Sequence, residues 1–278
     1  MVRTLLVRGL LLGLLAGLVA GAFAFVVGEP HVESAIAIEE AASAEAASGV
    51  AANAASGAEA GAAHEHEGGT AEAARGHDHG EEAVVSRPGQ KAGLFLATGL
   101  YGLSVGGVFA LVYAGLRGRV GPRSEGGLAL AAAATAFLAI VLVPFLKYPA
   151  NPPAVGDPDT IGDRTLLYVV MVLVGLAATA VSAASTRRVS RAAGPWARWG
   201  VAAGTFLIPV IVAWLLLPRI DEVPEGFPGS LIWEFRLASL GTQLVFWASF
   251  GVLFGLACDR AARHTIPAPA GEPLSAPS

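Results

Sequence analysis

The sequence predicts an all-α polytopic membrane protein, built as a bundle of about six transmembrane helices. Of its 278 residues, 54% are apolar and only 14% are charged, and the mean hydropathy is +0.60. Soluble domains carry about 25% charged residues, so this chain has too little polar surface for a soluble globule. Its apolar runs are continuous and show no period-2 alternation, which favours helices over a transmembrane barrel.

Six apolar stretches are long enough to cross a bilayer core, which takes about 20 helical residues. They cover residues 5–27, 92–116, 126–146, 165–185, 199–217 and 237–258. Arg3 precedes the first stretch as it would a signal peptide, but the stretch is too long for a 7–15-residue signal core, so we expect it to be retained. The predicted division is a first helix with its outer extension over 1–42, a loop over 43–90, a five-helix bundle over 91–258 and a disordered tail over 259–278.

The basic residues predict the orientation of the bundle. One side collects 11 of the 18 basic residues, in short segments: Arg3, Arg8, Arg117, Arg119, Arg123, Arg187, Arg188, Arg191, Arg198, Arg260 and Arg263. The other side carries 19 of the 22 acidic residues. Because short cytoplasmic segments are enriched in Lys and Arg, we expect a multi-pass membrane protein with both termini in the cytoplasm.

The long outer loop is acidic and rich in Ala, Gly, Ser and Glu. Residues 28–90 contain 12 acidic side chains against Arg75 and Arg87. Such a composition cannot offset the entropy of ordering, so we expect disorder from about Ser43 to Ser86. The start of the loop, residues 29–40, is predicted to continue the first helix beyond the membrane, with Glu29 and Glu33 on one face.

Five of the six histidines lie in this loop, and four of them form the pairs His64-Glu65-His66 and His77-Asp78-His79. Neutral imidazole binds divalent transition metals, and neighbouring carboxylates concentrate cations. The candidate metal ligands are therefore His31, Glu29, Glu33, His64, His66, His77 and His79, as an exchangeable capture site. A solvated spacer without metal binding is the alternative. Imidazole does not select among Co, Ni, Cu and Zn, although the lack of clustered Cys or Met argues against a Cu(I) site.

Polar residues near the outer face predict the mouth of a pathway. The loop after the third span carries Asn151, Asp157 and Asp159 among several prolines, and the last span begins with Glu234, Arg236 and Gln243. Arg236, Ser239 and Gln243 share one helix face, and polar groups entering a membrane need partners or a wet cavity. Two alternatives stay open: helix capping with an Asp159–Arg164 pair in the loop, and ordinary bonding between helices.

Glycines recur every fourth residue in the first span, at Gly9, Gly13, Gly17 and Gly21, and in the pairs Gly102/Gly106 and Gly251/Gly255. Such spacing permits close approach of two helices in lipid. Tight packing within the chain is the favoured interpretation, and an interface between copies is the alternative.

Several motifs resemble the CbtA family. They are KYPANPP at 147–153, GDP at 156–158, TIG at 160–162, WxFRxASL at 233–240, and the stretch from GEPH at 28–31 to EE at 39–40. The similarity covers nearly the whole chain, and the family is described as the probable cobalt transporter subunit of bacteria. The resemblance implies cobalt uptake, a link to cobalamin regulation and a small, single-span, histidine-bearing partner called CbtB. Family descriptions give five spans, whereas this sequence predicts six.

The sequence therefore predicts a membrane subunit for divalent-metal uptake, with Co(II) as cargo and no tightly bound cofactor. The alternative is a non-conducting accessory or scaffold that delivers metal to another permease. No Walker A motif is present, the spans lack a catalytic pair that would suit an enzyme, and a net charge of −4 without a basic stripe argues against nucleic acid.

Overall fold

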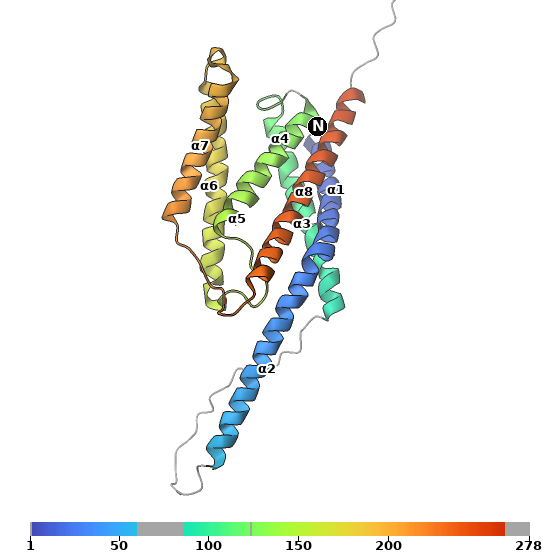
Figure 1. Cartoon of the computed structure of the whole chain (residues 1–278). Coiled ribbons are helices and arrows are strands. Elements are labelled where there is room, and N and C mark those ends of the chain that lie inside the picture. The colour runs from blue at the N-terminus through green and yellow to red at the C-terminus, as the bar shows by residue number, and fades with distance from the viewer. Residues whose placement is uncertain (1, 60–85, 123, 265–278) are drawn as a thin grey trace, which may run out of the picture.

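The structure is a computed structural model that describes residues 2–59, 86–122 and 124–264, and all its regular elements there are helices (Figure 1). They are α1 (Val2–Phe23), the π-helix η1 (Ala24–Gly28), α2 (Glu29–Glu59), α3 (Arg87–Leu116), α4 (Glu125–Ala136), the π-helix η2 (Phe137–Leu142), α5 (Val143–Lys147), the 3₁₀ helix η3 (Pro158–Thr160), α6 (Ile161–Arg188), the 3₁₀ helix η4 (Arg191–Ala193), α7 (Gly194–Leu216) and α8 (Gly229–His264).

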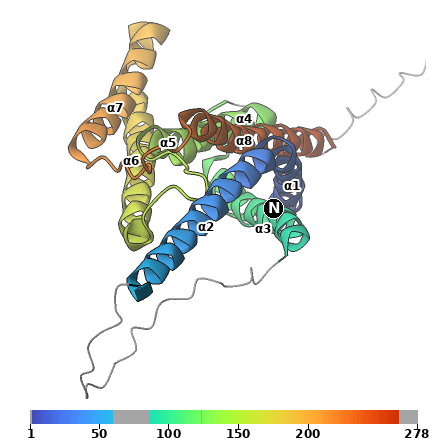
Figure 2. The same ribbon diagram turned by 60° about the horizontal axis from the view of Figure 1, so that its bottom comes forward.

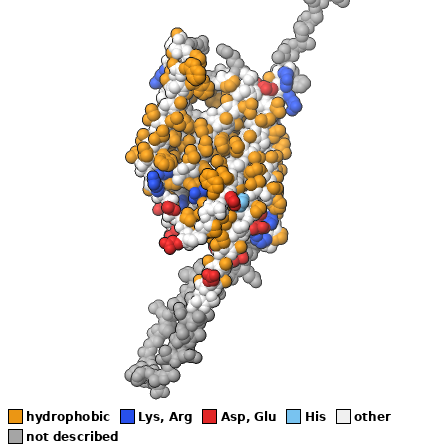
Figure 3. Space-filling view, in the orientation of Figure 1, with side chains coloured by type: hydrophobic (Ala, Val, Ile, Leu, Met, Phe, Trp, Pro, Cys, Tyr) orange, Lys and Arg blue, Asp and Glu red, His pale blue; other side chains and the backbone are white. Residues whose placement is uncertain are grey.

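The six predicted spans are confirmed. Six helical segments of the described chain are long and apolar enough to cross a membrane: Val2–Gly49, Arg87–Leu116, Glu125–Lys147, Pro158–Arg188, Gly194–Leu216 and Gly229–Arg263. Hydrophobic side chains cover the middle of the visible face, and charged side chains gather toward its two ends (Figure 3). The protein is therefore a multi-pass membrane protein with six spans.

Two helices reach further than the composition predicts. Helix α2 continues to Glu59 although disorder was expected from about Ser43, and α8 ends at His264 although a disordered tail was expected from residue 259. Both extensions grow from a helix that already exists, so they avoid the cost of nucleation. Residues 41–59 are rich in Ala, the residue with the highest helix propensity, which explains why a segment with little to pack against stays helical.

Helices α1 and α3 contact each other along two glycine faces. A Cβ atom at Gly13 would overlap the carbonyl oxygen of Gly102, and a Cβ at Gly106 would overlap that of Gly9. Because lipid tails are as apolar as the side chains, there is no hydrophobic driving force between helices in a membrane, and such helices associate by close van der Waals contact between backbones. The glycine ridge thus forms an interface within the chain, as the sequence favoured.

Aromatic side chains of α3 and α8 form the centre of the bundle. Phe109 makes edge-on contacts with Phe250 and Phe254, with ring centroids 4.9 and 5.5 Å apart. Tyr113 contacts Phe254 in the same way at 5.1 Å. On another side of α8, Gly251 and Gly255 lie against residues of α4. These contacts hold α8 between α3 and α4.

The α6–α7 hairpin stands apart from this centre (Figures 1 and 2). Helix α6 approaches the bundle through Gly175, where a Cβ atom would overlap the carbonyl oxygen of Ala139 in η2. No residue of α7, all of which is described, is buried. A pocket lined by residues of both helices of the hairpin and of α8 lies at one end of this region.

Substituting Gly106 by Ala tests the glycine contact. The added methyl group would meet the backbone of α1, and overpacking of this kind costs about 1–3 kcal/mol. We expect G106A to lower the melting temperature of the detergent-solubilised protein by several degrees. G115A is the matched control, since a Cβ on Gly115 of the same helix meets nothing within 4 Å; equal losses from both variants would contradict the interface.

Candidate functional site

A pocket of about 930 Å³ opens at the end of the bundle where α5 ends and α8 begins. Its wall includes α5, the first turns of α6, the loop between α7 and α8, and the first turns of α8. Of the six predicted pathway residues, Asn151, Arg236 and Gln243 line it, together with Ser239. We call it the Arg236 pocket. Asp157, Asp159 and Glu234 lie outside its wall.

Arg236 ties the proline-rich loop to α8. Its Nη2 donates to Oδ1 of Asn151 at 2.9 Å, and its Nε donates to the carbonyl oxygen of Ala150 at 3.3 Å. A guanidinium group needs several acceptors when it leaves water, and the loop supplies them. The Asn151 oxygen is therefore occupied by a cation of the protein itself.

Gln243 stands one helical turn beyond Ser239 on the same face. Its Oε1 accepts a hydrogen bond of 3.2 Å from the hydroxyl of Tyr101 in α3. This contact joins α3 to the pocket wall, so the polar stripe of α8 meets both a cavity and partner side chains.

The charged lining of the Arg236 pocket is mostly positive. Its cationic members are Lys147, Arg164, Arg219 and Arg236, and Asp221 is its acidic member. Lys147 is held at the wall, donating to the carbonyl oxygen of Trp214 at 2.8 Å and lying 4.9 Å from the centre of the Trp214 ring. By Coulomb's law such a lining repels an unaccompanied divalent cation. The pocket in this conformation does not suit bare Co(II).

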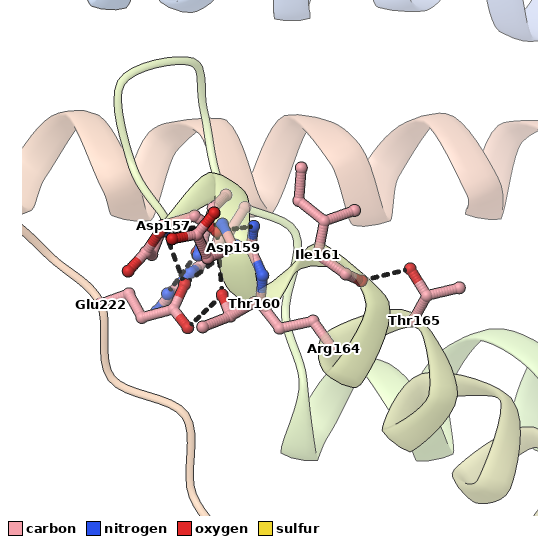
Figure 4. Close-up of polar contacts among 9 residues, drawn as sticks. Asp157, Asp159, Thr160, Ile161, Arg164, Thr165 and Glu222 are labelled. Atoms are coloured by element: carbon pink, nitrogen blue, oxygen red, sulfur yellow. Dashed lines mark hydrogen bonds and ion pairs between the residues drawn. The ribbon is translucent and has the colours of Figure 1, made fainter.

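Glu222 joins the two loops at this end (Figure 4). Its Oε1 accepts from the Thr160 hydroxyl at 2.6 Å, its Oε2 accepts from the backbone N–H of Asp157 at 3.0 Å, and Arg164 lies 3.3 Å away. The bond from Thr160, the bond from the Asp157 backbone and the nearby Arg164 charge lower the pKa of Glu222 below its ordinary value of 4.5. The carboxylate thus cross-links the α5–α6 and α7–α8 connections.

Asp157 acts as a helix cap. Its side chain accepts from the backbone N–H of Asp159 at 2.9 Å, at the start of η3. The alternative pairing of Asp159 with Arg164 is wrong, because Arg164 instead reaches Glu222 and the carbonyl oxygen of Asp157. Arg164 therefore pairs with Glu222, 58 residues away along the chain, and not with the nearby Asp159. Spacing along the sequence does not show this.

The predicted ligands at the start of α2 divide between two sets of partners. Nδ1 of His31 lies 3.6 Å from Oε2 of Glu234 at the start of α8. Glu29 pairs with Arg87 at 3.0 Å, and Glu33 pairs with Lys91 at 2.6 Å. The two glutamates therefore neutralise cations at the start of α3, while His31 faces a different carboxylate.

The two His-x-His pairs, His64/His66 and His77/His79, lie outside the described residues. Within the described part of the chain, no group of three or more His, Cys, Asp or Glu side chains is placed to hold a metal. Among the described residues, His31 and Glu234 are thus a pair without a third such side chain beside them.

The sequence analysis missed Glu222 and Tyr101 as members of this region and gave Arg164 the wrong partner. Glu222 stands in an acidic loop of the kind that usually faces water, Arg164 lies in the first turn of α6, and Tyr101 is one aromatic among many in an apolar span. Only the opposite charges of Glu222 and Arg164 hinted at a contact between them.

The model of one protein family matches residues 2–259, almost the whole chain. The chain belongs to the CbtA family. That family is described as "Probable cobalt transporter subunit", which assigns its members to transport and to an assembly of more than one subunit. Comparison with curated proteins and with solved structures gave no match.

Replacing Glu222 by Gln tests the cross-link between the loops. Because the pKa of Glu222 is lowered in the folded protein, its stabilising contribution is present above pH 4.5 and is lost as the pH falls through the lowered folded-state pKa. The protection of residues 217–228 from hydrogen exchange, corrected for the intrinsic pH dependence of amide exchange, should therefore fall with acid in the wild type.

In E222Q the same segment should exchange faster already at pH 7, and the part of the pH dependence due to this carboxyl should disappear. E225Q, in the same acidic loop, is the control. Identical exchange profiles for wild type and E222Q would contradict the cross-link.

Proposed function

We propose that this protein is the membrane subunit of a divalent-metal uptake transporter, with Co(II) as cargo. The family match over residues 2–259 and the six spans support this function. The proposed location is the bacterial inner membrane, with both termini in the cytoplasm. The start of α1 and the end of α8 lie at the same end of the bundle (Figure 1), as such a topology requires.

The observation that carries the metal-handling role is the approach of His31 to Glu234. Metal–ligand bonds to imidazole nitrogen and carboxylate oxygen are about 2.0–2.2 Å long, so two ligands of one ion lie at most about 4 Å apart. The 3.6 Å between Nδ1 and Oε2 falls within that limit. With water completing the sphere, the pair would bind an ion weakly and release it, as a transport step needs.

The position of His31 gives the outer loop its role. Helix α2 leads directly from His31 toward the segment that contains the two His-x-His pairs. We propose that these pairs gather metal, that His31 and Glu234 receive it at the surface of the bundle, and that Asn151, Asp157, Asp159, Arg236 and Gln243 belong to the entry region. A small single-span, histidine-bearing subunit of the CbtB type would complete the assembly.

The membrane potential can drive such uptake. The sequence has no Walker A motif, and an inside-negative potential of 100 mV contributes about 4.6 kcal/mol for a divalent cation. The positive lining of the Arg236 pocket then requires that its cations move away from the path or that metal takes a route next to it, past Glu234.

The same lining favours a second function. A non-conducting accessory would collect metal on its outer surface and deliver it to another permease, and it would need no cation pathway through its bundle. An accessory can tolerate Lys147, Arg164, Arg219 and Arg236 around the pocket at this end, whereas a conductor must overcome their repulsion of the metal ion.

Reconstitution tests the transport proposal. Purified protein in liposomes with an inside-negative potential should accumulate labelled Co(II), alone or with the small partner. H31A and E234Q should each raise the half-saturating cobalt concentration about tenfold, the lower end of the cost of removing a metal-site partner. E40Q, an exposed carboxylate further along α2, should leave it unchanged. No uptake with or without the partner would reject conduction.

Deleting residues 60–85, with a Gly/Ser linker in their place, separates the two functions in cells that lack their own copy. A conductor should lose uptake at low cobalt and keep slow uptake at high cobalt, because the bundle remains. An accessory should lose uptake at every concentration. Cobalt accumulation by cells across a concentration series measures the difference, and the deletion leaves α2 and α3 intact.

A further inference from the structure

A second pocket, of about 960 Å³, lies at the opposite end of the bundle, where α1 begins and α8 ends. Its wall comes from the α3–α4 connection, the last turn of α6 and the second turn of α7. The charged members of this wall are Arg117, Arg119, Arg187 and Arg198, with Glu125. We call it the four-arginine pocket.

Glu125 does not neutralise this set. One of its oxygens accepts from Nε of Arg117 at 2.6 Å, and the other accepts from the hydroxyl of Tyr113 at 2.5 Å. Arg119 donates to the carbonyl oxygen of Gly115 at 2.9 Å. Within the described residues, no ion pair involves Arg187 or Arg198. Three guanidinium groups around the pocket therefore lack a carboxylate partner there.

Membrane topology alone does not explain this gathering. Arginines are expected in short cytoplasmic segments, but this expectation concerns their number and does not require that they lie close together in space. Here they come from two connections far apart in the sequence and surround one hollow, although like charges repel at short range. The first N–H groups of α4 already have acceptors, the Asp259 carboxylate and the Ser124 hydroxyl, so the arginine side chains are what would attract a further negative charge. An anion would offset the repulsion.

We propose that the four-arginine pocket binds a phosphate-bearing anion. The planar guanidinium fork matches two phosphate oxygens at once, and Arg187 and Arg198 from one hairpin can hold a phosphate against Arg119 of the other connection. The same chemistry is offered by the headgroup of an anionic phospholipid and by a soluble phosphate compound. Binding would fasten the α6–α7 hairpin to the α3–α4 connection, at the place where the hairpin otherwise stands apart.

The test uses full-length protein and two probes. Native mass spectrometry of protein from phosphatidylcholine nanodiscs doped with phosphatidylglycerol measures retained anionic lipid, and calorimetry in neutral detergent measures binding of pyrophosphate. The double variant R187Q/R198Q should reduce the bound probe at least tenfold. R188Q/R260Q is the matched control, because it removes the same charge from the same end but neither residue lines the pocket.

Retention of phosphatidylglycerol without pyrophosphate binding would support the pocket with a lipid headgroup as its ligand. Pyrophosphate binding would support it with a soluble phosphate compound. Binding of neither probe, or equal losses in R187Q/R198Q and R188Q/R260Q, would overturn the proposal. Unchanged helicity and elution volume confirm that each variant is folded.

Discussion

The backbone contact between α1 and α3 is the interaction on which the arrangement of the outer end depends. Glycines on both helices let the chains approach until a single added methyl group would collide with a carbonyl oxygen. This contact places the end of α1 beside the start of α3. Glu29 then pairs with Arg87 and Glu33 pairs with Lys91, so the start of α2 is held beside the start of α3. His31, which lies between the two glutamates in the sequence, faces Glu234 of α8.

The two ends of the bundle differ in the partners of their charged side chains. At the α5–α8 end, several polar groups have partners from another loop or helix although the pocket lining is positive: Glu222 pairs with Arg164, Arg236 donates to the Asn151 and Ala150 oxygens, and Glu234 faces His31. At the other end, arginines from two connections surround a pocket whose one carboxylate is already engaged. Matched charges join loops to one another, whereas an unmatched set attracts a ligand of opposite sign.

A metal pathway of the kind we propose must reconcile an acidic, histidine-bearing segment with a positively lined opening. The segment before α3 is acidic, whereas the charged lining of the Arg236 pocket is mostly positive. Arg236 is held by one amide oxygen and one backbone carbonyl, neither of them charged. Moving Arg236 away from the proline-rich loop would lower the positive charge of the opening, but Lys147, Arg164 and Arg219 would still outnumber Asp221, so other cations of the lining would have to move as well.

The sequence alone determined the membrane class, the number of spans and the glycine faces, because these follow from hydropathy and spacing along one helix, which are local properties. It also placed Arg236, Ser239 and Gln243 on one face of α8, since a helical repeat needs no tertiary information. Composition alone did not predict the continuation of α2 to Glu59, because it shows how little the segment can bury and not that a helix already precedes it. Which carboxylate meets which cation was decided by the tertiary structure alone. Glu222 with Arg164, and His31 with Glu234, are separated by many residues in the chain, and only the packing of helices brings their short-range interactions within reach.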